Sequence, residues 1–253
     1  MNEIEEYLSK EYADADKFHD ECGVFGILGH PDASAHTALG LHALQHRGQE
    51  SAGIVSTTGE QFYSHHGLGS VGENFSSAEV IDELKGIAAI GHNRYSTTGH
   101  PEIRNIQPLF ADLAFGGLSI AHNGNLTNAV RLRKDLVKRG SIFRSTSDTE
   151  VIIHLMALST GAQVTDRLVD ALRQVEGAYS LVALTQDALI GIRDPHGVRP
   201  LVLGTLDGSY ILASETVALD IIGAEFVRDI APGEMVLIKM GKLTSFKPFQ
   251  ETN

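Results

Sequence analysis

The stretch FHDECGVFGI, residues 18–27, contains Cys22, the only cysteine among the 253 residues of the chain. Two acidic residues, Asp20 and Glu21, precede Cys22, and a glycine-rich apolar run follows it that is typical of a buried strand. A single cysteine in a protein core usually behaves as a small hydrophobic residue. Cys22 is therefore either a packing residue or a nucleophile, and the flanking sequence has to distinguish the two.

The composition restricts the class of protein. Apolar residues make up 42% of the chain and charged residues 21%, as in an ordinary globular protein. One cysteine excludes an internal disulfide and a four-cysteine metal or iron–sulfur site built from this chain alone, so we expect a reducing, cytoplasmic location. The formal charge of −12 disfavours nucleic-acid binding. No apolar run approaches the ~18 residues of a membrane span, so we expect no membrane contact.

Residues 1–21 differ in composition from the rest of the chain. They are rich in acidic side chains and lack the apolar core and basic start of a signal peptide. Taken alone, such a segment is typical of a frayed acidic terminus. The composition changes sharply at Cys22, so we expect the folded part to begin there.

Apolar patterning predicts an alternation of many strands with fewer helices. Strands are expected at residues 24–28, 51–57, 61–66, 87–93, 109–113, 118–122, 179–185, 188–193, 201–204, 210–213 and 235–239. Helices are expected at residues 33–45, 78–84, 126–138, 148–158, 165–174 and 217–222. Several strands are continuously apolar, which predicts sheets covered on both faces by other layers. The polar loop from Arg94 to Pro108 is longer than most connections and is therefore a functional candidate.

Two patterns that suggest a cofactor or metal are weak here. The run GLGSVG, residues 67–72, matches the dinucleotide-binding pattern, but no convincing helix follows it, and the pattern requires one. His42 and His46 stand four apart on an expected helix, and His65 and His66 are adjacent. Neither pair is accompanied by cysteines or an HExxH arrangement, so we expect no metal site.

Two polar motifs flank expected strands. In QHRGQESAG, residues 45–53, Gly48 would suit the left-handed position that ends a helix, but the polar side chains outnumber what a helix end needs. In GHNRYSTTG, residues 91–99, Arg94 follows a strand. Arginine there is either an ordinary surface residue or a bidentate partner for a carboxylate.

Two further motifs lie in the middle of the chain. In AHNGNLTN, residues 121–128, Asn123-Gly124 is either a tight turn or an oxyanion hole made of a side-chain amide and a backbone N–H. In TSDTE, residues 146–150, Asp148 is typical of a helix start, where capping alone could explain it.

Together, the four motifs resemble one family: the class II glutamine amidotransferases, N-terminal-nucleophile hydrolases whose nucleophile is an N-terminal cysteine. The match runs from Cys22 to about Lys247 and looks most like the glutaminase half of amidophosphoribosyltransferases. Sugar-phosphate amidotransferases would read more like YRGYDSAG and HTRWATHG at the first two motifs. The resemblance implies an α+β fold, a four-layer αββα sandwich of two packed, mainly antiparallel sheets between helical layers.

The resemblance also implies the catalytic groups. Cys22 would attack the carboxamide of glutamine, and Asn123 and Gly124 would form the oxyanion hole. A free thiol has a pKa of ~8.5 and needs a base. If residues 1–21 are a propeptide that is removed, the α-amino group of Cys22, with a pKa of ~7.7–8.0, supplies that base. We therefore expect a glutaminase domain at residues 22–253.

Substrate binding is implied in the same way. Arg94 would bind the α-carboxylate of glutamine and Asp148 its α-ammonium, with Thr97 and Gly124 assisting. The loop from Arg94 to Asn105 would close over the substrate. The supporting residues would be Arg47 and Tyr95.

No phosphoribosyltransferase motif is present in the chain. The resemblance therefore implies that ammonia is passed to phosphoribosyl pyrophosphate (PRPP) by a domain absent from this chain, for purine synthesis. Magnesium and any 4Fe-4S cluster would belong to that C-terminal part, with no cofactor in this chain, and the full-length protein would be a homo-oligomer. Two alternatives stay open: the glutaminase domain of a sugar-phosphate amidotransferase or a glutamate synthase, and a regulatory domain that binds glutamine without hydrolysing it.

Overall fold

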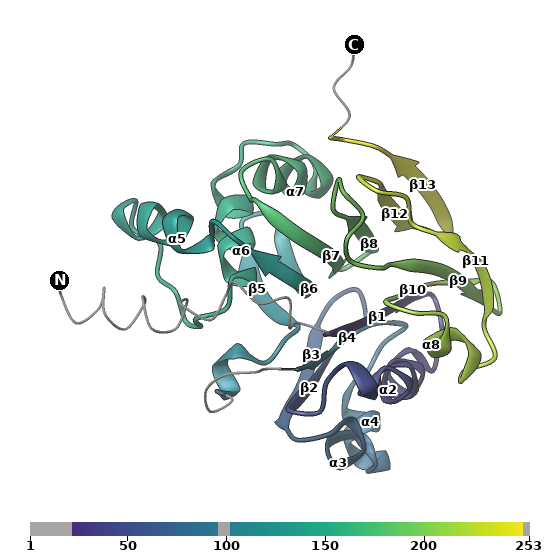
Figure 1. The fold of residues 1–253 in the computed structure, drawn as a ribbon. Coiled ribbons are helices and arrows are strands. Elements are labelled where there is room, and N and C mark those ends of the chain that lie inside the picture. Colours follow the sequence, from purple (N-terminus) through teal and green to yellow (C-terminus); the bar gives the residue numbers. More distant parts are fainter. Residues whose placement is uncertain (1–21, 96–101, 250–253) are drawn as a thin grey trace.

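The computed structural model describes residues 22–95 and 102–249 (Figure 1). The acidic segment 1–21 and Thr97 lie outside the described residues, so the propeptide and the role of Thr97 stay predictions. Among the described residues, no helix is both long and apolar enough to cross a bilayer.

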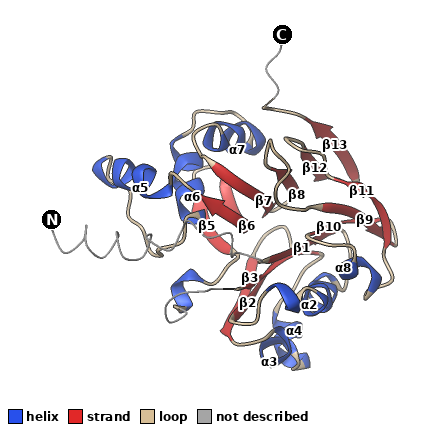
Figure 2. Ribbon diagram, viewed as in Figure 1, coloured by secondary structure: helices blue, strands red, loops and turns tan. Residues whose placement is uncertain are grey.

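Two antiparallel sheets form the centre of the fold (Figure 2). The seven-stranded sheet has the order β11 (Glu225–Asp229), β9 (Val202–Leu206), β10 (Ser209–Ala213), β1 (Gly23–Leu28), β4 (Ala88–Arg94), β2 (Ser51–Thr57) and β3 (Phe62–Leu68). The six-stranded sheet has the order β13 (Lys242–Phe246), β12 (Met235–Lys239), β8 (Ala188–Arg193), β7 (Gly177–Leu184), β6 (Gly116–Leu126) and β5 (Leu109–Leu113).

Helices cover the outer face of each sheet (Figure 1). The seven-stranded sheet packs against α2 (Ala33–Ala43), α3 (Val71–Phe75), α4 (Ala78–Glu83) and α8 (Val217–Asp220). The six-stranded sheet packs against α5 (Ala129–Lys138), α6 (Thr149–Leu158) and α7 (Val164–Leu172). Short 3₁₀ turns lie at η1 (Gln45–Arg47) and η2 (Ile103–Asn105). The α+β sandwich expected from the family resemblance is confirmed.

The apolar strands alternate between two cores. Val24 of β1 and Ile90 of β4 point into the core between the sheets, where they meet Val182 of β7. Phe25 and Ile27 point the other way, into the core beneath α2. Strands in the middle of the sandwich bury both faces, which explains why they read as continuous apolar runs.

The structure corrects the interpretation of GLGSVG. A helix does begin at the end of this run: α3 starts at Val71, and Ser70 and Glu73 form a reciprocal capping box at its start. The expectation that no helix follows was therefore wrong. The helix is only five residues long, which is why its pattern was not visible in the sequence.

Candidate active site

Strand register brings Cys22 and Arg94 to the same end of the seven-stranded sheet. In the antiparallel β1–β4 pair, Gly23 lies opposite Asn93, so one further step places Cys22 opposite Arg94. On the other side of β4, Arg94 pairs with Ser51 of β2. Cys22 is 8% exposed. A nucleophile candidate and a carboxylate-binding candidate are thereby held side by side.

Alternation along the strands gives the direction in which these side chains point. Cys22 has the same parity as Val24, and Arg94 the same parity as Ile90, and both apolar residues face the six-stranded sheet. Extending the pattern aims Cys22 and Arg94 at the space between the two sheets.

Asn123 occupies the facing surface. It lies on β6 two residues after Ala121, which also faces the inter-sheet core, and it is 0% exposed. Neither amide atom of Asn123 has a hydrogen-bond partner, and neither does the hydroxyl of Ser180, its cross-strand neighbour on β7. Buried polar groups without partners cost about 1–3 kcal/mol each and call for an explanation. A ligand placed between the sheets would satisfy them.

A direct contact joins the two sheets beside these residues. His92 Nε2 of β4 lies 3.1 Å from the backbone oxygen of His122 on β6 and donates to it. Burial lowers the pKa of His92 to about 3, with the nearby positive charge of Arg94 acting in the same direction. His92 is therefore a neutral structural donor at ordinary pH.

The Asn123-Gly124 pair is part of a strand. β6 runs through both residues and pairs with β7 as far as Leu126, so the tight-turn interpretation was wrong. Gly124 has φ +152°, and a Cβ atom there would lie 2.1 Å from the oxygen of Ala178. Only glycine fits this position without displacing β7.

Asp148 holds the end of β6. It begins α6 without capping the helix through its side chain, so the capping-alone interpretation was wrong. Its Oδ2 accepts the N–H of Leu126 at 2.9 Å, and its Oδ1 lies 3.5 Å from Nδ1 of His122. Burial acts to raise the pKa of Asp148, but His122 and the hydrogen bonds outweigh it and leave the pKa below its ordinary value. A carboxylate is thereby kept ionised.

Arg47 supports the chain at the cysteine. Its Nε donates to the backbone oxygen of Cys22 at 2.9 Å, and its guanidinium forms an ion pair with Glu215. His46 Nε2 lies 3.1 Å from the same carboxylate. Arg47 therefore holds the backbone at Cys22, and its supporting role in the site stays a prediction.

Gly48 is required for a close approach between two backbone segments and not, as expected, for a left-handed helix end. Its φ of 176° is extended, so the left-handed capping interpretation was wrong. A Cβ atom at Gly48 would lie 2.4 Å from the carbonyl carbon of Arg94 and 2.7 Å from the nitrogen of Tyr95. Glycine is therefore needed because η1 and the end of β4 pass in close contact. Tyr95 itself is 47% exposed.

Glu50, Ser180 and His92 were not assigned a role from the sequence. Oε2 of Glu50 is buried without a partner, and burial raises the pKa of its carboxyl while Arg94 opposes that shift. The only sequence signal was the density of polar side chains in QHRGQESAG. The burial that marks these three residues appears only in the folded chain.

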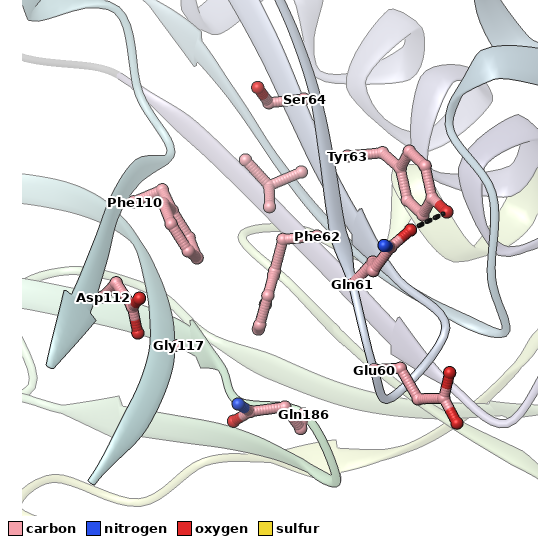
Figure 3. A pocket seen from close by; sticks show the side chains of 10 residues that line it. Glu60, Gln61, Phe62, Tyr63, Ser64, Phe110, Asp112, Gly117 and Gln186 are labelled. Carbon is pink, nitrogen blue, oxygen red and sulfur yellow. Dashed lines mark hydrogen bonds between the residues drawn. The ribbon is translucent and has the colours of Figure 1, made fainter. Parts of the chain in front are cut away.

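Other hollows and clusters lie away from this site. A cavity of about 380 Å³ opens between the edge strands β3 and β5, where Phe62 and Phe110 face each other (Figure 3). It contains none of the expected site residues. His42 and His46 do not share a helix, because α2 ends at Ala43, and the two residues cannot act as a helical metal-binding pair.

A cysteine at the start of an inner strand, opposite a buried amide in an αββα sandwich, is the arrangement of the N-terminal-nucleophile class of amidohydrolases. The family described as "Glutamine amidotransferase domain" matches residues 92–220, just over half of the chain, and the chain belongs to that family. The matched range includes Arg94, Asn123, Gly124 and Asp148.

Similar proteins carry one name repeatedly. Amidophosphoribosyltransferase from Rhizobium etli is 55% identical over 95% of this chain and 48% of its own length. The Bacillus subtilis protein of that name is 46% identical over 87% of this chain. The structure of glutamine PRPP amidotransferase from B. subtilis, complexed with ADP and GMP, superimposes with a TM-score of 0.86 at 43% identity. It is matched over 92% of this chain and 50% of its own. The chain thus spans about half the length of these relatives.

Proposed function

We propose that this chain is the glutaminase part of an amidophosphoribosyltransferase, with the Cys22 thiol as nucleophile. One observation carries the proposal: strand register and alternation direct Cys22, Arg94 and the unpartnered amide of Asn123 into the same space between the sheets. Glutamine offers that space a carboxamide carbon for the thiolate and a carboxylate for Arg94.

The charges of the site match the charges of free glutamine. Arg94 binds the α-carboxylate, for which a guanidinium is the best bidentate donor. Asp148, kept ionised, binds the α-ammonium, with Gly124 and Thr97 assisting. Within the described residues the guanidinium of Arg94 has no hydrogen-bonded side-chain partner, which leaves it available to a substrate.

The reaction follows from these positions. The thiolate adds to the carboxamide carbon, and the oxygen becomes an oxyanion that receives hydrogen bonds from Nδ2 of Asn123 and the N–H of Gly124. The α-ammonium of Cys22, having taken the thiol proton, returns it to the departing ammonia. The thioester that remains is hydrolysed by water, which releases glutamate and restores the thiol.

This mechanism requires a free α-amino group at Cys22, and hence removal of residues 1–21. The domain then comprises residues 22–253. The name of the similar B. subtilis structure, glutamine PRPP amidotransferase, supports PRPP as the acceptor of the ammonia. A second similar structure, 44% identical and described as an allosteric regulatory enzyme of purine biosynthesis, supports purine synthesis as the setting. Magnesium, any 4Fe-4S cluster and the contacts of a homo-oligomer would belong to the remainder of the full-length protein, in the cytoplasm.

The test compares the mature chain with three variants in a glutamine hydrolysis assay. Intact mass first establishes whether the chain begins at Cys22. We expect Cys22→Ala to abolish glutamate release, Arg94→Lys to raise KM for glutamine, and Asp148→Asn to raise KM similarly. Residual activity in Cys22→Ala would contradict the proposal. Glutamine binding without ammonia release by the mature chain would instead support the regulatory alternative.

A further inference from the structure

We propose that His30, Asp32 and His36 form a binding site for a divalent transition-metal ion of borderline softness, with Zn²⁺ the expected occupant. One ligand atom from each of the three side chains lies within 4.8 Å of the other two. The group occupies the turn between β1 and the first turn of α2, in the sequence HPDASAH, residues 30–36. The sequence alone did not single it out, because the residues fit no common metal-binding motif.

His30 is the fixed member of the group. It is 7% exposed, and its Nδ1 accepts the N–H of Asp32 at 3.0 Å. Its Nε2 lies 3.9 Å from Oδ2 of Asp207, in the turn between β9 and β10. In a metal-binding histidine, one ring nitrogen usually binds the metal and the other usually faces a carboxylate. Asp207 is thus placed to orient His30.

His36 faces His30 from the helix. The two imidazole rings meet edge to face with centroids 4.4 Å apart. Nδ1 of His36 is buried and has no hydrogen-bond partner, and coordination to a metal ion would satisfy it. Burial and His30 both lower the pKa of His36, outweighing Asp32 and Asp207, which favours the neutral form that binds metals.

Asp32 completes the set because it stands four residues before His36, on the same face of the helix start. Two imidazoles with a carboxylate favour zinc, nickel or copper over magnesium or calcium, which prefer oxygen ligands alone. Ligands of a tetrahedral zinc ion lie about 3.4 Å apart, given Zn–N bonds of ~2.0–2.1 Å. The ligand atoms must therefore draw together, and the exposed carboxylate of Asp32 and the half-buried ring of His36 are free to do so.

Coordination through Nδ1 of His30 would displace the N–H of Asp32 and leave Nε2–H directed at Asp207. One lost hydrogen bond is a small cost beside the apparent binding free energy of zinc sites. The ion would tie the end of β1 to the start of α2. This end of β1, at Leu28, is six residues from Cys22, roughly 20 Å along an extended strand. Metal binding would therefore stabilise the fold without entering the glutaminase chemistry.

The experiment uses the chain in a Cys22→Ser background, because a thiolate binds zinc. Isothermal titration with ZnCl₂ should show one equivalent bound more tightly than the rest, and thermal melting should shift upward with zinc concentration. His36→Ala and Asp32→Asn should each weaken that equivalent at least tenfold. Asp207→Asn should weaken it by about 10-fold through loss of the orienting carboxylate.

The matched control is His42→Ala, which removes an exposed imidazole from the same helix. Its titration should be unchanged. Cobalt(II) absorption provides a second measurement that does not depend on stability: a tetrahedral spectrum should appear in the parent and vanish in His36→Ala. The proposal is overturned if His36→Ala and His42→Ala lose zinc binding equally, or if neither variant changes it. Because activity plays no part in these readouts, failure of the glutaminase proposal would leave this test intact.

Discussion

The buried position of Asn123 in the fold lowers the stability of the protein. Its amide is buried without a partner, so the folded protein carries a desolvation cost that only a bound ligand would offset. Residues of this kind are usual at functional sites, where stability has been given up for binding or catalysis.

We therefore expect Asn123→Ala to lower kcat for glutamine hydrolysis by about 10²–10³ with little change in KM, as loss of an oxyanion donor does. The free energy of unfolding should change by less than about 1 kcal/mol, since the small cavity is offset by removal of an unsatisfied amide. Steady-state kinetics and urea denaturation measure the two effects. An unfolding change of several kcal/mol with unaltered kcat would show that Asn123 is only a core residue.

His92 gives the protein a dependence of stability on pH. Its pKa is about 3 in the folded chain and ~6.5 in the unfolded chain, so the unfolded chain takes up the proton first as the pH falls. Stability should therefore fall as the pH drops from about 6.5 towards about 3, by up to ~1.4 kcal/mol per pH unit from this residue.

In His92→Gln, which keeps a donor for the oxygen of His122, this contribution disappears. Urea denaturation at pH 7, 6 and 5 should show a shallower slope for the variant than for the parent. His36 and His66, whose pKa values are also lowered, are present in both proteins and cancel in the difference. Parallel slopes would mean that His92 is protonated in the folded chain.

Several candidate site residues could be proposed from motifs in the sequence, but the residues that surround them in the fold could not. Asn123, Gly124 and Asp148 stand in short patterns that survive in one sequence. Ser180 has no such pattern: its significance comes from lying opposite Asn123 on another strand, with a buried hydroxyl that lacks a partner.

At the scale of elements, strands with two covered faces were predicted well, as were the edge strands β3 and β5, but the edge strands β11 and β13 were missed. β11 (EFVRD) and β13 (KLTSF) end the two sheets and expose many side chains. They are neither continuously apolar nor alternating, so the signal that identifies buried strands is missing. The three central helices at residues 126–138, 148–158 and 165–174 were predicted within a few residues of α5, α6 and α7.

β6 shows how tertiary pairing overrides a local preference. Asn-Gly favours a turn, and the strand was predicted to end at His122. In the structure, β7 continues to pair with β6 until Gly177 meets Leu126. Eight paired positions outweigh the preference of one dipeptide, and the candidate oxyanion hole is the result.

The close contact between η1 and the end of β4 can be tested by replacing Gly48 with alanine, which adds one methyl group. Gly48→Ala places a Cβ atom 2.4 Å from the backbone of Arg94, so one element must move. We expect about 1–3 kcal/mol lower stability from this overpacking. KM for glutamine should also rise, because the displaced end of β4 carries the guanidinium of Arg94, which we propose binds the α-carboxylate of the substrate.

The matched control is Gly72→Ala in α3, where a Cβ atom meets nothing within 4 Å. There alanine should raise stability by about 0.5–1 kcal/mol through its helix propensity, with unchanged kinetics. Circular dichroism melts and steady-state assays on both variants make the comparison. Equal behaviour of the two glycine variants would refute the close-contact argument.

For the whole molecule, the order of the strands in the two sheets could not be predicted from the apolar pattern of the sequence. β1 lies between β10 and β4, although β10 comes almost two hundred residues later in the chain. Such pairing depends on contacts between distant segments, which a single sequence does not display. The four-layer arrangement was available only through the resemblance of the motifs to a known family.

The distance between the sheets is the quantity on which the candidate site depends, because Cys22 stands on one sheet and Asn123 on the other. Gly26 of β1 sets that distance locally: a Cβ atom there would lie 2.7 Å from Cγ1 of Val182 on β7. Val182 is fully buried in the core between the sheets.

We expect Gly26→Ala to lower the free energy of unfolding by about 1–3 kcal/mol, since a methyl group must be forced into a packed layer. Val182→Ala should also destabilise, by leaving a cavity. In the double variant the added methyl enters the space that was vacated, so the loss should be smaller than the sum of the single losses by at least about 0.5 kcal/mol. Urea denaturation of the parent, the two single variants and the double variant measures this coupling directly.

Glutamine hydrolysis should follow the same order as stability. We expect kcat to be lowest in Gly26→Ala and partly recovered in the double variant, because recovery of the sheet spacing restores the approach of the thiol to Asn123. Strictly additive unfolding energies would mean that the two sheets do not meet at Gly26 and Val182, and recovery of stability without recovery of kcat would mean that sheet spacing does not govern the site.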